Sequence, residues 1–290
     1  MSLHYPPLFA VRDAVARALA EDLTPLGDIT AALLPPGATA RAAFVARAEG
    51  VVAGRSCVEE TFRQLDASVT MTWARDDGAE VGAGETIAEV AGSLESILTA
   101  ERTALNFLCH LSGVASITRR YVRAVHGTGC RVWDTRKTTP GLRALEKAAV
   151  RAGGGNNHRG SLSEMVLIKD NHLGGMSITD AVRRARMRWP ARTVEVECDR
   201  IEQVREAVEA AADLILLDNM SPAEVAAAVG EIGGRATVEV SGGVTLATIG
   251  EYARAGADLV SVGALTHSAP VLDIGLDLET DVPGSAAEGN

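Results

Sequence analysis

The stretch TVEVECDRIEQVREAVEAAADLILLDN, residues 193–219, contains the pattern that decides the fold of this chain. TVEVEC and LILLDN are short segments rich in valine, isoleucine and leucine, and the residues between them place apolar side chains at helical spacing. A strand, a helix and a second strand in this order predict a right-handed βαβ unit with parallel strands. Each of these strands finishes close to an acidic residue, Glu197 in the first and Asp218 in the second.

The same alternation extends outward from this unit in both directions. Strands are predicted at residues 131–135, 165–170, 193–198, 214–219, 236–243 and 259–264. Helices are predicted between them at residues 141–153, 177–189, 200–212, 221–232 and 245–256. Capping signals mark three of the helix starts, at Ser177–Asp180, Asp199–Glu202 and Ser221–Glu224.

An open, doubly wound sheet and a closed α/β barrel both fit this rhythm. Every predicted strand brings a polar, charged or glycine residue to its carboxyl end, which is where the reacting groups of an α/β barrel lie. The edge strands of an open sheet would more often lack such a residue. The pattern therefore favours a parallel α/β barrel of about six strands.

The first part of the chain has a different pattern. The opening residues predict a short amphipathic helix, and residues 42–92 alternate with period two between glycine and acidic turns, as antiparallel hairpins do. Residues 93–127 predict a long helix interrupted near Ser112 and Gly113.

Composition excludes several classes of protein. The 290 residues carry a formal net charge of −10 and no basic tail, so nucleic-acid binding is not expected. No signal peptide and no membrane-spanning stretch are recognisable. The four cysteines lack CxxC or zinc-ligand spacing, which predicts free thiols and a cytoplasmic protein.

Positive charge gathers in one region of this acidic chain. Residues 131–170 hold eight Lys or Arg against four Asp or Glu, including all three lysines, Lys137, Lys147 and Lys169. A solvated helix face would account for residues 143–151, and Lys147 is expected on that surface. It does not account for the cations in predicted loops and at strand ends, which are Arg136, Lys137, Arg159 and Lys169. These predict a site for a small anionic ligand, because arginine pairs with carboxylates and lysine with phosphates.

Carboxylates and glycine turns lie at the same predicted edge. Glu197 and Asp218 could hold Mg²⁺ when a substrate brings phosphates, or could instead pair with the neighbouring cations. Ser241, Gly242 and Gly243 follow one strand, and Val262, Gly263 and Ala264 follow the next. Two such turns on the last strands of a barrel predict a phosphate cradle. Together these groups fit the transfer of a phosphorylated sugar to an acidic acceptor.

These strings resemble a known family. DTRKTTPGLRALEKAAVRAGGGNNHRG, VLIKDNH, ECD, LLDN, SGG and VGALTHS stand in the order and spacing of the quinolinate phosphoribosyltransferases. The resemblance covers nearly the whole chain, including AERTALNFLCHLSG at residues 100–113. One departure follows Arg159, where Gly160–Glu164 replaces the family's usual bulky residue, Gly-Leu and later aspartate.

The resemblance implies an N-terminal antiparallel α/β sandwich (residues 1–112), an α/β barrel (113–269) and a tail (270–290) that packs back on the sandwich. It implies a homodimer in which Arg102 reaches the partner's quinolinate. It further implies that the quinolinate carboxylates are bound by Arg136, Arg159 and Lys169, with His158 nearby. The implied ligands of phosphoribosyl diphosphate are Lys137, Glu197, Asp218, Ser241–Gly243 and Gly263, with Mg²⁺ at Glu197 and Asp218. Thr135, Val262 and Ala264 are also implied to bind substrate.

The implied reaction is phosphoribosyl transfer to the pyridine nitrogen followed by loss of CO₂, with Lys137, Lys169, Glu197 and Asp218 as the catalytic residues. A transferase for nicotinate would share the fold but would need fewer carboxylate-binding cations. A molybdenum-associated relative shares part of the DTRKT pattern but typically lacks the string at Lys169–His172. A Schiff-base lyase using Lys169, or a non-catalytic binding barrel, would leave the carboxylate pair beside the phosphate site unexplained.

Overall fold

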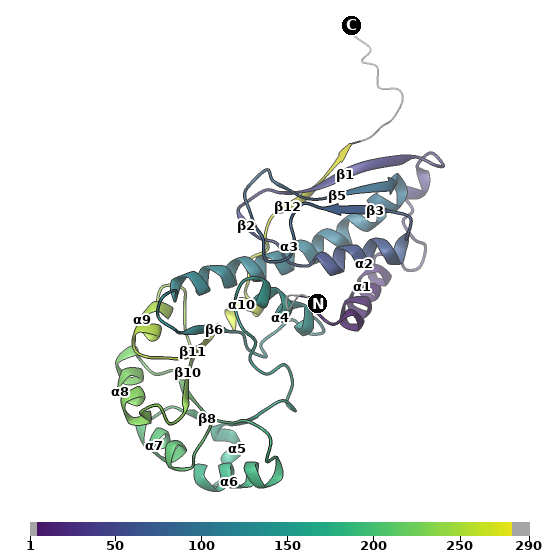
Figure 1. Ribbon diagram of the computed structural model, residues 1–290. Coiled ribbons are helices and arrows are strands. Elements are labelled where there is room, and N and C mark those ends of the chain that lie inside the picture. Colours follow the sequence, from purple (N-terminus) through teal and green to yellow (C-terminus); the bar gives the residue numbers. More distant parts are fainter. Residues whose placement is uncertain (1–4, 280–290) are drawn as a thin grey trace. The chain divides into compact units, whose positions relative to one another are not determined.

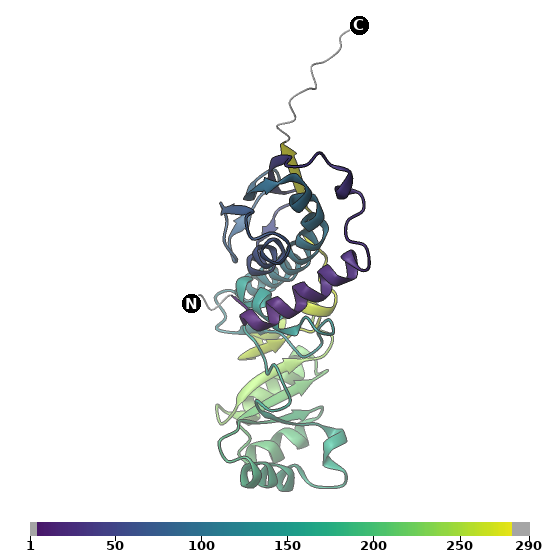
Figure 2. The ribbon, with the colours of Figure 1, turned by 90° about the vertical axis from the view of Figure 1, so that its right-hand side faces the viewer.

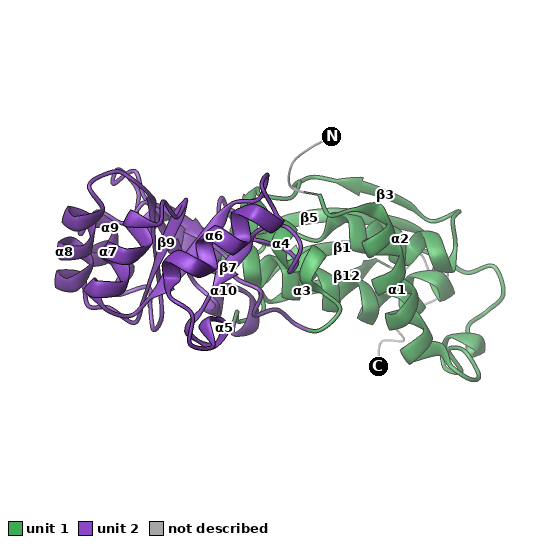
Figure 3. Ribbon diagram, turned by 90° about the horizontal axis from the view of Figure 1, so that it is seen from below, with its two compact units in different colours: residues 1–117, 140–153, 269–290 green, residues 118–139, 154–268 purple. Residues whose placement is uncertain are grey.

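The computed structural model describes residues 5–279, which form two compact units (Figure 3). The first unit comprises the described parts of residues 1–117, 140–153 and 269–290, and the second comprises residues 118–139 and 154–268. The units differ from the division expected after residue 112, because the first takes in residues 140–153. Residues 280–290 of the predicted C-terminal tail lie outside the described residues.

The second unit is built on a six-stranded parallel sheet. Its strands are β6 (Arg131–Trp133), β7 (Val166–Ile168), β8 (Val194–Cys198), β9 (Leu214–Asp218), β10 (Thr237–Ser241) and β11 (Leu259–Ser261). Their order is β6-β11-β10-β9-β8-β7, which is the cyclic order of a barrel opened between β6 and β7. The predicted fold class, a barrel-like parallel sheet with an N-terminal antiparallel sheet, is confirmed.

Helices cover the outer side of these strands. Figure 1 shows α6, α7, α8 and α9 in an arc outside the sheet. The helices of this region are α5 (Asp170–Leu173), α6 (Ile178–Arg188), α7 (Ile201–Glu209), α8 (Pro222–Ile232), α9 (Ile249–Arg254) and α10 (Ala264–His267). With the helices outside, side chains on the inner face of the strands converge on the interior.

Two of the three predicted caps are confirmed. Ser177 accepts a hydrogen bond from the Asp180 N–H, and Ser221 and Glu224 form a capping box ahead of α8. The cap predicted at Asp199 is wrong, because α7 begins after Arg200, which makes no side-chain cap. The Asp199 N–H instead donates to the side chain of Gln203.

The first unit packs helices on an antiparallel sheet. Its strands are β1 (Thr39–Ala46), β2 (Gly50–Val51), β3 (Thr70–Trp73), β4 (Glu80–Val81), β5 (Thr86–Ser93) and β12 (Ile274–Glu279). The main sheet has the order β12-β1-β5-β3, and β2 pairs with β4. The helices are α1 (Leu8–Leu23), η1 (Ala31–Leu33), α2 (Arg55–Leu65), α3 (Leu94–Ala124) and α4 (Arg143–Ala152).

Helices α2 and α3 lie against one face of the main sheet, and α1 lies alongside α2 (Figures 1 and 2). Phe44 of β1 and Phe62 of α2 meet edge to face in the core, with ring centroids 6.4 Å apart. The sequence analysis did not anticipate α2. Among the described residues, no helix is long and apolar enough to cross a membrane.

The predicted break in the long helix is wrong, because α3 is continuous from Leu94 to Ala124. Ser112 exchanges hydrogen bonds with the backbone of Ala53. Gly113 lies where the C-terminal segment crosses the helix, and a Cβ there would stand 2.1 Å from the carbonyl oxygen of Pro270. These two residues therefore serve close packing against neighbouring segments and do not end the helix.

Helix α4 is buried where a solvated face was expected. Glu146 is fully buried and accepts from Nε2 of His110 at 2.9 Å, and Lys147 is also buried. The expectation that Lys147 lies on a helix surface is therefore wrong. The packing of α4 within the first unit overrides its charged sequence.

Candidate active site

A cavity of about 570 Å³ opens at the carboxyl ends of the parallel strands. It lies in the second unit, and most of the predicted site residues surround it. The lining residues are Thr135, Arg136, Lys137, His158, Arg159, Leu167, Lys169, Glu197, Leu216, Asp218, Asn219, Glu239, Ser241, Gly242, Gly243 and Ser261. Of the predicted residues, Arg102 and residues 262–264 are not among them.

The strand pleat determines which side chains reach this cavity. Side chains two residues apart on a strand point to the same face, so Leu216 and Asp218 both line the cavity from β9, and Glu239 and Ser241 line it from β10. Asp218 and Ser241 are direct neighbours in the register of the two strands. Asp218 and Ser241, at the carboxyl ends of the strands, thus line the mouth of the cavity. Leu216 and Glu239, two residues earlier, line its floor.

Two arginines form the cationic side of the cavity. Arg159 donates from Nη1 to the carbonyl oxygen of Met165 at 3.3 Å. Burial, together with the nearby charge of Arg136, lowers the pKa of Arg159. Two guanidinium groups held this close in a partly buried place favour an anion with more than one charge.

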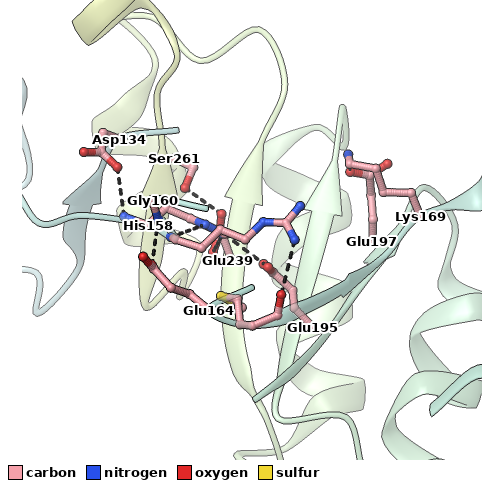
Figure 4. Close-up of polar contacts among 11 residues, drawn as sticks. Asp134, His158, Gly160, Glu164, Lys169, Glu195, Glu197, Glu239 and Ser261 are labelled. Carbon is pink, nitrogen blue, oxygen red and sulfur yellow. Dashed lines mark hydrogen bonds and ion pairs between the residues drawn. The ribbon is translucent and has the colours of Figure 1, made fainter. Parts of the chain in front are cut away.

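A lysine and two carboxylates line the same cavity. Lys169 and Glu197 point toward one another and form an ion pair (Figure 4). Asp218, at the end of the neighbouring strand, accepts from the Asn219 side chain at 2.7 Å. Oxygen donors on adjacent strands next to a mobile ammonium group can bind a polar ligand or a divalent cation.

The turn after β10 requires glycine. Gly242 has φ +93° and Gly243 has φ +61°, which is the left-handed region that side chains rarely adopt. A Cβ at Gly242 would also stand 2.3 Å from Oδ1 of Asn219. The chain therefore passes this point with its backbone exposed to the cavity, as a phosphate-binding turn does.

The turn after β11 lies beside Lys137. A Cβ at Gly263 would stand 2.9 Å from Cδ of Lys137, and Thr266 donates to the Lys137 carbonyl oxygen at 2.6 Å. Residues 262–264 therefore lie beside Lys137, although they do not line the cavity itself.

Two buried acidic groups to which the sequence analysis gave no role lie at this site, Glu239 in the lining of the cavity and Glu195 beside His158. Glu195 and Glu239 are fully buried, and Ser261 donates to Glu239 at 2.6 Å. Desolvation raises the pKa of Glu195 to about 7 and that of Glu239 to about 8. The signal for Glu239 was its place two residues before Ser241 on the same strand.

Hydrogen bonds to Asp134 hold the segment that follows Asn156. Asp134, fully buried, accepts from the His158 N–H at 2.9 Å and from the Asn157 side chain at 2.6 Å. The loop at Gly160–Glu164, which differs from the usual family sequence, closes on itself, because the Gly160 N–H donates to the Glu164 carboxylate at 2.7 Å. Residues of this loop line another cavity, of about 550 Å³, which shares Arg159 with the first.

Arg102 lies on α3 in the first unit, where its side chain is exposed. The structure therefore gathers the predicted residues of the second unit into one cavity and leaves Arg102 apart from its lining.

Comparisons with known proteins identify the family of this chain. Models of quinolinate phosphoribosyl transferase match the chain over residues 28–112, for the N-terminal domain, and 114–277, for the C-terminal domain. A carboxylating nicotinate-nucleotide pyrophosphorylase of Mycobacterium leprae is 44% identical over 279 residues, covering 93% of this chain and 97% of that protein. A decarboxylating quinolinate phosphoribosyltransferase of Nicotiana tabacum is 38% identical over 297 residues, covering 95% and 84%.

A solved structure agrees as well. The nicotinate-nucleotide pyrophosphorylase from Francisella tularensis superposes with a TM-score of 0.92 at 38% identity, covering 96% of this chain and 99% of that one. The family predicted from the sequence strings is confirmed, and this chain belongs to the quinolinate phosphoribosyltransferase family.

Proposed function

We propose that this enzyme transfers the phosphoribosyl group of phosphoribosyl diphosphate to quinolinate and releases CO₂. The products are nicotinate mononucleotide, diphosphate and CO₂, as in de novo NAD biosynthesis. The observation that carries the proposal is one cavity that combines paired arginines, a lysine–carboxylate pair and a glycine turn at the ends of parallel strands. The names and similarity of the family members support the same reaction.

Quinolinate would lie on the arginine side of the cavity. Arg136, Arg159 and Lys169 supply positive charge for its two adjacent carboxylates. A guanidinium group can donate two parallel hydrogen bonds to one carboxylate, which fixes the plane of the ring as well as its position. This arrangement distinguishes quinolinate from nicotinate, which has a single carboxylate.

Phosphoribosyl diphosphate would span the remaining sides. The turn at Ser241–Gly243, together with residues 262–264, would hold the 5′-phosphate through backbone N–H groups. Lys137 and Thr135 would face the diphosphate, and Glu197 and Asp218 would bind the ribose hydroxyls.

The carboxylates of Glu197 and Asp218 also fit Mg²⁺. They are hard oxygen donors at the ends of adjacent strands, and Mg²⁺ usually takes one or two protein carboxylates together with water and substrate phosphate. When bound, Mg²⁺ would neutralise charge on the departing diphosphate. Because Lys169 already pairs with Glu197, substrate binding would exchange that contact for contacts to ligand.

The reaction follows from these placements. The lone pair of the pyridine nitrogen forms a bond to the anomeric carbon as the bond to diphosphate breaks, and Lys137 stabilises the leaving charge. The ring nitrogen is then cationic. The bond to the 2-carboxylate breaks, its electron pair remains on C2 beside that nitrogen, and CO₂ departs. A proton from solvent completes the product, so the ring itself acts as the electron sink.

We also propose a homodimer in which Arg102 of each subunit reaches the other subunit's cavity, since Arg102 is exposed and apart from the lining of its own. A cytoplasmic location is supported by the four cysteines, all of which are free thiols.

One assay separates this function from its rival. The protein is mixed with Mg²⁺, phosphoribosyl diphosphate and either quinolinate or nicotinate, and diphosphate and CO₂ are measured, with a control lacking phosphoribosyl diphosphate. We expect diphosphate and CO₂ to form in the mixture that contains quinolinate and not in the mixture that contains nicotinate. Product with nicotinate alone would contradict the assignment of the arginine pair to two carboxylates.

A further inference from the structure

Both ring nitrogens of His158 are engaged beneath the cavity (Figure 4). Nδ1 accepts the backbone N–H of Arg159 at 2.7 Å. Nε2 lies 3.2 Å from a carboxylate oxygen of Glu195 and 3.6 Å from one of Glu239. The side chain is only 7% exposed, so the ring is held within the floor of the site.

These partners assign the tautomer of the ring. A nitrogen that accepts an N–H bond carries no proton, so the proton of the neutral ring is on Nε2, which donates to Glu195. His158 then has no N–H left for a substrate carboxylate. Ligand atoms of His158, Glu195 and Glu239 lie within 4.8 Å of one another, but Nε2 presents a proton to the carboxylates and not the lone pair that a metal needs.

Both carboxyl groups are fully buried beside His158. Glu195 and Glu239 come from β8 and β10, and the intervening strand β9 places Leu216 beside Glu239. Burying two acidic groups side by side is unfavourable unless they gain hydrogen bonds. Here one oxygen of Glu195 accepts from Nε2–H of His158 and one oxygen of Glu239 accepts from Ser261, whereas the second oxygen of each carboxyl group is buried without a hydrogen-bond partner.

His158 in turn holds the backbone from which Arg159 projects. Its own N–H donates to Asp134, and its ring accepts the N–H of the next residue. The ring also meets Trp133 edge to face, with centroids 5.4 Å apart. Fixed at these points, the peptide presents Arg159 to the cavity, where it is among the lining residues.

We propose that Glu195 and Glu239 are positioning residues that hold the His158 imidazole, and through it Arg159, in the geometry that binds a substrate carboxylate. In this role His158 acts on quinolinate binding through Arg159. This inference rests on the proposed function, because it takes the ligand of Arg159 to be quinolinate.

A matched pair of variants at Glu239 tests the kinetic consequence. Glu239→Gln keeps the size of the side chain and one acceptor oxygen, whereas Glu239→Ala removes both. For Glu239→Ala we expect the KM of quinolinate to rise about 10-fold or more while that of phosphoribosyl diphosphate stays within about twofold, and for Glu239→Gln a change below about threefold. Equal increases in both KM values, or no increase with Glu239→Ala, would overturn the proposal.

A spectroscopic test covers the case in which Glu239→Ala does not fold. The wild-type enzyme is labelled with ¹⁵N in its six histidine rings, and His158→Asn identifies the two signals of interest. We expect Nε2 protonated and Nδ1 unprotonated, both before and after saturation with benzene-1,2-dicarboxylate, which has the two carboxylates of quinolinate but no ring nitrogen.

A proton on Nδ1 of His158 in either state would mean that Nδ1 cannot accept the Arg159 N–H, and it would refute the positioning role. This measurement needs no turnover. Its failure is therefore distinct from failure of the proposed function, which would appear as absence of product from quinolinate.

Discussion

The Cα of Gly242 lies so close to Asn219 that an added Cβ would stand 2.7 Å from the Asn219 backbone nitrogen. Because φ at Gly242 is +93°, alanine there adds strain as well as a clash. For Gly242→Ala we expect the KM of phosphoribosyl diphosphate to rise at least about 10-fold and the free energy of unfolding to fall by about 1–3 kcal/mol. Steady-state kinetics and urea unfolding measure both.

Gly234→Ala is the matched control for this variant. Gly234 also has a positive φ, +75°, but an added Cβ would meet nothing within 4 Å. It should lose about 1 kcal/mol of stability through strain alone and keep its KM for phosphoribosyl diphosphate. Equal kinetic effects in the two variants would argue against the turn after β10 as the phosphate site.

Arg159→Ala should weaken quinolinate binding selectively. A charge-assisted hydrogen bond contributes about 1.5–3 kcal/mol, which predicts a rise in quinolinate KM of roughly 10- to 150-fold with little change for phosphoribosyl diphosphate. Arg200→Ala serves as the control, because Arg200 is exposed and pairs with exposed Asp199. An unchanged quinolinate KM in Arg159→Ala would disprove its assignment.

Much of this site could be predicted because the carboxyl ends of parallel strands meet at one edge. Lys169, Glu197 and Asp218 are placed there by any βαβ series, whether or not the exact pairing is known. The role of Glu239 could not be predicted in that way. It depends on β8 and β10 placing Glu195 and Glu239 around one histidine. The sequence does not show how deeply these side chains are buried or that they meet.

Tertiary packing accounts for the errors elsewhere. Lys147 lies on a helix whose sequence is charged, yet the helix is buried within the first unit. Gly113 looked like a helix breaker, although it is the place where residues 270 and 271 pass. In both cases a distant segment of the chain decided the outcome, and local propensity did not report it.

Glu197→Gln should impair turnover and leave quinolinate binding nearly unchanged, whereas Arg159→Ala should impair quinolinate binding. The change removes the negative charge that pairs with Lys169 but preserves shape. We expect kcat to fall roughly 10- to 100-fold and more Mg²⁺ to be required, because one of two carboxylates for the metal is lost. Quinolinate binding measured by calorimetry without phosphoribosyl diphosphate should remain within about threefold of wild type. A normal Mg²⁺ requirement would count against Glu197 as a ligand.

The buried carboxyl of Glu239 should make stability depend on pH. Desolvation, reinforced by Glu195, raises its pKa to about 8 in the folded protein, from 4.5 for an unperturbed glutamate. The folded state then holds a proton that the unfolded state has released, so this stability is fully present below about pH 4.5 and is lost as pH rises toward 8. Wild type should lose about 2–4 kcal/mol between pH 5 and pH 8 through this group.

Glu239→Gln cannot titrate, so its urea unfolding free energy should vary less over that range. The stability of the variant relative to that of the wild type should therefore increase as the pH rises. Parallel curves for the two proteins would show that Glu239 is not protonated in the folded state.

Mixing two inactive variants tests whether subunits share sites. Arg102→Ala subunits keep Lys169, and Lys169→Ala subunits keep Arg102. If Arg102 crosses the interface, a mixed dimer contains one complete site, in the subunit that retains Lys169. Random exchange at equal amounts makes half of the dimers mixed, so about a quarter of wild-type activity should return. If Arg102 served its own subunit, every site would lack one of the two residues. Exchange verified by mass-tagged subunits without recovery of activity would then reject the shared site while leaving the cavity in the second unit unaffected.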